Sequence, residues 1–83
     1  MIWVTQATAL PDYRLRLQFS DGKAGEVDLR AVIFDDLRPI VVALRSPQAF
    51  AACRVDMDTV VWDNGFDLAP EFLYARLQGP AAA

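Results

Sequence analysis

Apolar and polar residues alternate strictly over positions 13 to 20. The apolar positions are Tyr13, Leu15, Leu17 and Phe19, and the polar ones are Arg14, Arg16, Gln18 and Ser20. Because successive side chains of a strand point to opposite faces, a period of two predicts a strand with one buried face. The preceding residues 2–8 are β-branched and aromatic, and Leu10-Pro11-Asp12 predicts a turn. The two segments are therefore expected to form a hairpin.

The third strand must pair so that the apolar face of the second stays intact. A two-residue turn at Asp21-Gly22 would place Glu26 opposite Leu17, which mixes charged and apolar side chains on one face. A three-residue loop that ends at a left-handed Gly22 avoids this mixing. The pairs that it predicts are Leu17 with Gly25, Leu15 with Val27 and Tyr13 with Leu29.

Short helices are predicted where capping residues precede good helix formers. Asp28 can cap a helical turn that runs from Leu29 to Phe34. Ser46-Pro47 is a stronger signal, because a capping Ser followed by Pro at the first helical position predicts a helix from Pro47 to about Cys53. Between these helices, the apolar run from Ile40 to Leu44 is too short to assign by period and fits either a strand or irregular core.

The last third of the chain predicts a second hairpin and a final helix. Residues 54–57 and 59–62 are β-rich and are separated by Asp58, and Asn64-Gly65 closes the second strand in a turn. Pro70 begins a helix with an apolar stripe, and Gly79 is its expected stop. The prediction is an α+β domain with antiparallel strands in the order β-β-β-α-β-β-α. It spans residues 1–78, and residues 79–83 are expected to fray.

The amino-acid composition excludes several kinds of chemical site. The 83 residues include one Cys and no His, so the chain cannot form an internal disulfide or a Cys-rich zinc site, and it lacks the commonest general base. The net charge of −3 gives no basic excess for phosphate binding, so no direct nucleic-acid contact is expected. No leader and no apolar run of about 20 residues is found, which predicts a cytoplasmic protein without membrane contact. No cofactor is expected.

Negative charge is concentrated in the last third. Residues 1–54 hold 7 basic and 6 acidic side chains, whereas residues 55–83 hold 1 and 5. The five carboxylates are Asp56, Asp58, Asp63, Asp67 and Glu71. They are either solvated groups, a surface for a basic partner, or a metal or acid–base site. The segment 63–67 lacks the ligand spacing of an EF-hand loop, which weakens the metal reading.

Large aromatic residues are numerous for so small a core. Trp3, Tyr13 and Trp62 are expected to be buried, whereas Phe66, beside a turn, is expected to be exposed. Cys53 is expected to be a buried structural thiol, because no His or Lys lies nearby to activate it. The candidate partner-binding residues are Asp63, Asn64, Phe66, Asp67, Glu71 and Tyr74.

Several short motifs follow one another along the chain: Trp3-Val4-Thr5, Tyr13-Arg14-Leu15, Phe19-Ser20-Asp21-Gly22, Asp28-Leu29, Ser46-Pro47-Gln48-Ala49-Phe50, Val55-Asp56, the stretch Trp62 to Pro70, and Leu73-Tyr74. This ordered set resembles the small bacterial family called domain of unknown function 2442. The resemblance covers about residues 2–77. It implies an α+β fold, which some relatives join to a helix-turn-helix module, and a frequent pairing with small toxin-like proteins. It supplies no catalytic residues.

These observations favour a non-catalytic protein-binding module over an enzyme. The partner expected from the acidic third and from the resemblance is a small basic, toxin-like protein, for which this chain acts as an antitoxin-like or regulatory partner. The alternative is a small metal-binding protein or enzyme built on the five carboxylates, which must then converge in a concave pocket. Self-association as a homodimer through an exposed sheet edge is compatible with either hypothesis.

Overall fold

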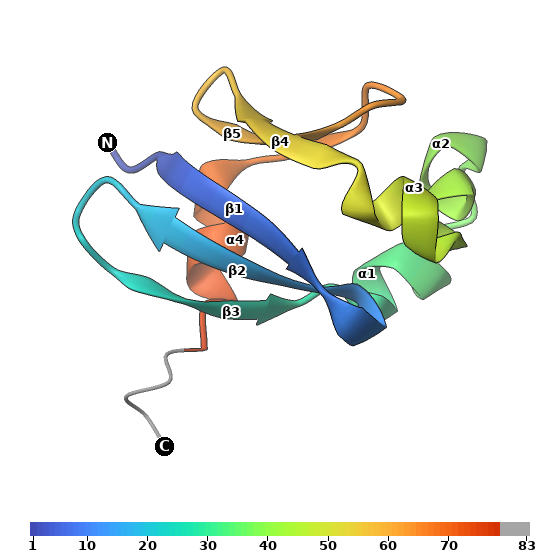
Figure 1. Cartoon of the computed structure of the whole chain (residues 1–83), viewed down its shortest axis with the longest axis horizontal. Helices are drawn as coiled ribbons and strands as arrows, with labels where there is room; N and C mark the ends of the chain where they lie inside the picture. The colour runs from blue at the N-terminus through green and yellow to red at the C-terminus, as the bar shows by residue number, and fades with distance from the viewer. Residues whose placement is uncertain (79–83) are drawn as a thin grey trace.

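A computed structural model describes residues 1–78 and shows two three-stranded antiparallel sheets joined by short helices (Figure 1). The first sheet contains β1 (Val4–Leu10), β2 (Arg14–Phe19) and β3 (Ala24–Asp28) in that order. The second contains β4 (Cys53–Asp56), β5 (Thr59–Trp62) and β6 (Asp67–Leu68). The predicted α+β class with antiparallel strands is confirmed, and the element order is close to the one expected.

The predicted register of the first sheet is confirmed. Leu17 pairs with Gly25 and Leu15 with Val27 across β2 and β3. The connecting loop has Gly22 at φ +92°, which is the left-handed conformation that the three-residue loop requires. Leu15, Leu17 and Val27 are all buried, so the apolar face of the sheet is continuous.

The second sheet lies beside the first along their edge strands. β4 runs next to β1 in Figure 1, and the turn between β4 and β5 is tied to the start of β1 by a hydrogen bond from Val4 N to Asp58 O of 2.9 Å. β4 and β5 form the predicted hairpin with Val55 paired to Val60. Its two-residue turn is Met57-Asp58.

Four short α-helices connect and cover the sheets. They are α1 (Arg30–Asp35), α2 (Pro39–Val42), α3 (Pro47–Ala51) and α4 (Pro70–Ala75), with 3-10 turns at Pro11–Tyr13 and Ala43–Arg45. The prolines that begin α3 and α4 lie where the sequence predicts, and the Ser46 side chain accepts a hydrogen bond from Ala49 N. Helix α3 ends before Cys53 because that residue begins β4. The expected Gly79 stop and the expected frayed tail lie outside the described residues.

The segment Ile40 to Leu44 is helical, which corrects the expectation of strand or irregular core. Pro39 occupies the first turn of α2, where its fixed φ favours a helix and its missing N–H is not needed. Val41 and Leu44 are both fully buried, and a spacing of three residues places them on one helical face. The side chains of this segment therefore follow a helical period that five residues are too short to reveal.

The core collects side chains from both sheets and all four helices. Trp62 at its centre is fully buried, and its indole N–H donates a 2.8 Å hydrogen bond to the carbonyl oxygen of Phe50. Tyr13 is half-buried, packs edge-on against Phe34 and Phe50, and donates its hydroxyl to the carbonyl oxygen of Arg45. The expectation that Trp3 is a core residue is wrong, because its side chain is 42% exposed.

Candidate interaction surface

The predicted residue Asn64 is a brace within the fold. It lies in the turn between β5 and β6, where its side-chain oxygen accepts a hydrogen bond from Phe66 N at 3.1 Å. Its side-chain nitrogen donates to the carbonyl oxygen of Ile40 at 2.8 Å. Gly65 follows at φ +92°, a conformation that favours glycine. Both polar ends of the exposed Asn64 side chain therefore make hydrogen bonds within the fold.

Phe66 is buried, which corrects the expectation that it is exposed. Only 7% of it is accessible, and its ring lies 5.7 Å from that of Trp62. The cause is a hydrogen bond of 2.8 Å from Trp62 N to Phe66 O, which folds the turn back over the core. The Arg38 guanidinium covers the Phe66 ring from outside at 5.8 Å. Phe66 is therefore a core residue and not a surface anchor.

Tyr74 on α4 ties the last helix to the loop between β2 and β3. Its hydroxyl donates to Asp21 Oδ2 at 2.7 Å, and its ring packs edge-on against Phe19. The hydrogen bond from Tyr74 is the main reason that the pKa of Asp21 is lowered, and the backbone N–H of Lys23 lowers it further. This predicted partner-binding residue therefore has a structural partner in the fold.

Asp63 and Asp67 lie on one outward face of the second sheet. Cross-strand pairing sets Arg54 beside Val61 and Val61 beside Asp67, so these side chains share a face. Arg54 makes ion pairs with Asp63 at 3.0 Å and with Asp56 at 3.9 Å. We call Asp56, Asp63 and Asp67 around Arg54 the acidic face; its net charge is −2. Glu71, the remaining predicted residue, is exposed in the first turn of α4.

The metal hypothesis requires carboxylates that converge, and the described residues contain no such cluster. Within residues 1–78, no group of three or more Cys, Asp or Glu side chains lies close enough to hold a metal ion. Two of the five carboxylates, Asp56 and Asp63, form ion pairs with Arg54 on the hairpin and do not point into a shared cavity.

A second exposed feature lies at the turn between β4 and β5, and the sequence reasoning missed it. Met57 in this turn is 87% exposed, and Val55 on β4 and Trp3 are partly exposed. The hydrogen bond from Val4 N to Asp58 O brings Trp3 to the same end of the molecule as the turn (Figure 1). We call Trp3, Val55 and Met57, with the adjacent carboxylates Asp56 and Asp58, the turn surface.

The backbone holds Trp3 in place on the turn surface. The carbonyl oxygen of Trp3 accepts a 2.8 Å hydrogen bond from Ser20 N, and Trp3 N donates to Ser20 Oγ at 3.2 Å. The Trp3 side chain is therefore exposed on a fixed backbone. Trp3 lies within the predicted strand of residues 2–8, where the sequence gives no signal for exposure, because aromatic residues are common in strands and Trp is highly buried on average.

The turn itself has an unfavourable sequence for its shape. Met57 and Asp58 have φ values of +51° and +68°. A two-residue hairpin turn with two positive φ angles is normally Asn-Gly or Asp-Gly, since these residues tolerate the left-handed conformation. Met has no such tolerance, so the backbone of Met57 is strained. Met57 is also the most exposed apolar residue of the turn surface.

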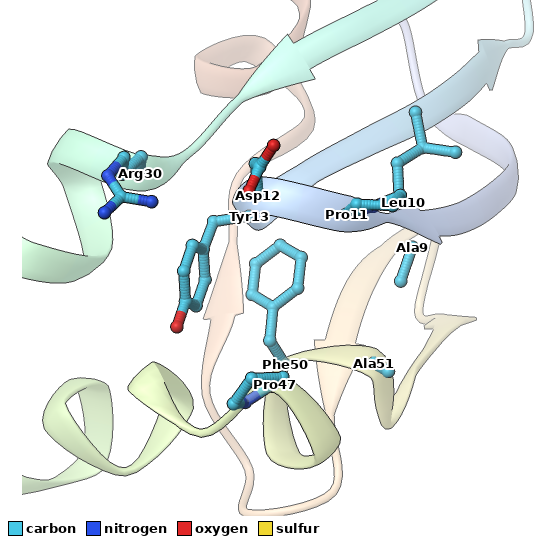
Figure 2. A pocket seen from close by; sticks show the side chains of 9 residues that line it. All are labelled: Ala9, Leu10, Pro11, Asp12, Tyr13, Arg30, Pro47, Phe50 and Ala51. Atoms are coloured by element: carbon cyan, nitrogen blue, oxygen red, sulfur yellow. The ribbon is translucent and has the colours of Figure 1, made fainter.

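One of the cavities among the described residues lies at the far end of β1. It has a volume of about 620 Å³ and is open to solvent. Its walls come from the end of β1, the 3-10 turn at Pro11–Tyr13, α1 and α3, as Figure 2 shows. None of these residues belongs to a site predicted from the sequence, because the cavity is assembled from three separate segments of the chain.

Among the described side chains, strong electrostatic effects are few. The Arg38 guanidinium holds the pKa of Asp36 at about 2, through hydrogen bonds to both carboxylate oxygens. Burial raises the pKa of the Cys53 thiol, which agrees with an unreactive, half-buried cysteine. None of the helices within residues 1–78 is long and apolar enough to span a membrane.

A solved structure and a family model both match this chain. No curated protein matches the chain. A solved structure matches with a TM-score of 0.77 and 28% sequence identity: the crystal structure of the "putative DNA binding protein" NE0471 from Nitrosomonas europaea. The match covers 99% of this chain but only 52% of that protein, so the chain spans about half of its length. Residues 4–79 match the model of a family described as protein of unknown function (DUF2442). The chain therefore belongs to the DUF2442 family.

Proposed function

We propose that this domain is a non-catalytic protein-binding module that holds a basic partner on its turn surface. The partner has the chemistry of a small basic protein, and the domain acts on it as an antitoxin-like or regulatory subunit. The observation that carries the proposal is Met57, which projects from a strained turn and is 87% exposed.

The chemistry of the turn surface matches that of protein interfaces. Exposed Trp and Met side chains are enriched at the centres of such interfaces, and polar groups surround them. Trp3 and Met57 supply the apolar centre, while Asp56 and Asp58 flank Met57 directly along the chain. Residues in unfavourable backbone conformations cluster at functional sites. They persist there only where the surrounding structure holds them in place.

The acidic face supports a partner of positive charge. Asp56 belongs to both surfaces, so negative charge extends from the turn over the outer side of β4, β5 and β6. Complementary charge accelerates association and disfavours acidic competitors. The same charge opposes direct binding to a phosphate backbone. The DNA-binding name of the Nitrosomonas europaea protein refers to a chain about twice as long.

The test is a pull-down from native lysate at two salt concentrations with the wild-type domain and a M57N/D58G double variant. The double variant removes the exposed Met but suits the turn better, so its folded state is at least as stable as that of the wild type. Loss of a stoichiometric basic protein with this variant then reports lost contact and not lost folding. A matched control, Leu37→Asn, removes an exposed apolar residue from the segment between α1 and α2.

The expected result is one basic protein that the wild type and L37N retain, that M57N/D58G loses, and that high salt weakens. Equal retention by all three proteins would contradict the turn surface as the site. Recovery of nucleic acid, or of a second copy of the domain alone, in place of a basic protein would overturn the proposal in favour of that partner.

A further inference from the structure

We propose that Asn64-Gly65 is a deamidation site that the folded domain protects by hydrogen bonds and that opening of α2 exposes to reaction. Asn64 is the only Asn of the chain, and a glycine follows it. An Asn side chain forms a cyclic imide most readily with a following glycine, because no Cβ hinders the approach. The site lies at the opposite end of β5 from the turn surface, so this inference is independent of the proposed function.

The chemical step needs only water besides the chain itself. The backbone nitrogen of Gly65 attacks Cγ of Asn64, so that a C–N bond forms and the bond from Cγ to Nδ2 breaks. Nδ2 leaves as ammonia and takes up the proton that the Gly65 nitrogen loses. Water then adds to one of the two carbonyl carbons of the imide and opens the ring. The product is aspartate or isoaspartate at position 64, which is about 1 Da heavier and negatively charged.

Three hydrogen bonds oppose this step in the folded state. Gly65 N, the attacking atom, donates to the carbonyl oxygen of Trp62 at 2.9 Å. Asn64 Nδ2, the leaving atom, donates to Ile40 O at 2.8 Å, and Asn64 Oδ1 accepts from Phe66 N at 3.1 Å. The attack removes the Gly65 proton and makes Cγ tetrahedral, so it disturbs the hydrogen bonds of both reacting groups.

Burial does not protect the site. Asn64 and Gly65 are both exposed. Beyond the neighbours of Gly65 in the chain, no heavy atom lies within 4 Å of the position that a Cβ of this residue would take. Water can therefore reach the turn, and the hydrogen bonds rather than exclusion of water keep the side chain from reacting.

The hydrogen bond to Ile40 makes α2 part of this protection. It reaches a distant segment of the chain, since Ile40 precedes Asn64 by 24 positions. Helix α2 has only four residues and a single buried side chain, that of Val41. So short a helix has little stability of its own, and such segments open at a lower free energy than the strands of a core. Opening of α2 frees Asn64 Nδ2 without unfolding of the sheets.

Deamidation prevents the original contact from forming again. A carboxylate at position 64 can still accept from Phe66 N, but it has no hydrogen to donate to Ile40 O. Two oxygen acceptors then oppose each other where a hydrogen bond was. Isoaspartate also lengthens the backbone by a methylene group within a tight turn. The product is therefore less stable, and it accumulates with the time that α2 spends open.

The first test compares the folded domain with the chain unfolded in guanidinium chloride at the same pH and temperature. The readout is the mass of the tryptic peptide 55–76, which contains Asn64 and no Gln. The folded domain should deamidate at least about tenfold more slowly, since reaction requires a rare open state. The matched control N64Q, whose longer side chain disfavours the same ring, should show no mass change in this peptide. Equal rates in the two states would overturn the proposal.

A pair of matched variants tests the role of α2. Val41 on α2 and Val27 on β3 are both fully buried, so V41A and V27A remove the same atoms from the core. With the two variants adjusted by urea to the same free energy of unfolding, V41A should deamidate at least about threefold faster than V27A. Equal rates would show that only global unfolding exposes the site and would overturn the role of α2.

Two measurements remain decisive if either variant does not fold. In the wild type, low concentrations of urea should accelerate deamidation less steeply than they raise the globally unfolded fraction, because local opening exposes little surface. A parallel increase would contradict local opening. N64D, which is the direct product, should have a lower urea midpoint than the wild type, and an unchanged midpoint would overturn the loss of stability. None of these measurements involves a partner, so failure of the proposed function leaves them unaffected.

Discussion

The side-chain nitrogen of Asn64 lies 2.8 Å from the carbonyl oxygen of Ile40, a residue 24 positions earlier in the chain. This hydrogen bond joins the turn between β5 and β6 to helix α2. Asn64 belongs to the most distinctive motif of the sequence, and its role is to hold together two segments that have no backbone pairing with each other. The motif therefore contributes first to the tertiary structure of the domain, and only then to a binding surface.

Replacement of Asn64 by Ala should destabilise the domain by about 1 to 2 kcal/mol. The substitution removes the hydrogen bond to Ile40 O and the one from Phe66 N, and typical net contributions are about 1 kcal/mol each. Urea unfolding followed by Trp fluorescence measures the change. Asp63→Ala, which removes only a surface ion pair to Arg54, is the control and should change stability by less than about 1 kcal/mol. Equal effects of the two substitutions would contradict the bracing role.

The double variant M57N/D58G should stabilise the domain by about 1 kcal/mol, since it replaces strained residues with the pair that the turn favours. The urea midpoint should rise while the m-value stays constant. The reverse control is Gly65→Ala at φ +92°, where the open surroundings leave backbone strain as the only effect. G65A should destabilise the domain by about 1 kcal/mol. A destabilised double variant would show that Met57 makes contacts that offset its strain.

Removal of the Asp36 carboxylate should change the response of the domain to acid. Arg38 lowers the pKa of Asp36 from 3.8 to about 2 in the folded state, so the interaction stabilises the fold above about pH 4. That contribution is lost as the pH falls from about 4 through about 2, and below about pH 2 the carboxylate is protonated in both states. The difference in Tm between wild type and D36N should therefore be constant from pH 7 to 5, shrink below about pH 4 and disappear below about pH 2.

The matched control for this acid titration is D35N. It removes a charge from the neighbouring residue, which makes no ion pair among the described side chains. A gap between wild type and D36N that persists unchanged to pH 2 would contradict the assigned role of Arg38.

Tyr74→Phe should raise the pKa of Asp21 toward its ordinary value of 3.8. The Tyr74 hydroxyl is the largest cause of the lowered value, and Phe keeps the ring packing on Phe19 while it removes the donor. Carboxyl ¹³C shifts recorded against pH measure the change directly. Tyr13→Phe also removes a hydroxyl, but that hydroxyl is partly buried and donates its hydrogen bond to the carbonyl oxygen of Arg45. It should leave the Asp21 titration unchanged, whereas an equal change in both variants would indicate a global effect.

Much of the local structure follows from the sequence alone. The alternation from Tyr13 to Ser20 predicts β2, and the requirement that Leu15 and Leu17 keep an apolar face predicts the register of β3. Ser46-Pro47 and Pro70 predict where α3 and α4 begin, since proline suits only the first helical turn. These features depend only on residues that are close together in the chain or on one strand pairing, and both can be inferred from the sequence pattern.

Only the tertiary structure decided the surfaces. Phe66 beside a turn gave every reason to expect exposure, but the turn folds over Trp62 and buries it. Trp3 and Met57 came to the same end of the molecule because Val4 bonds to Asp58, across more than fifty residues of chain. Periodicity tells which side of a strand or helix is apolar, whereas exposure and proximity depend on which distant segment packs there, and that choice is made by the whole fold.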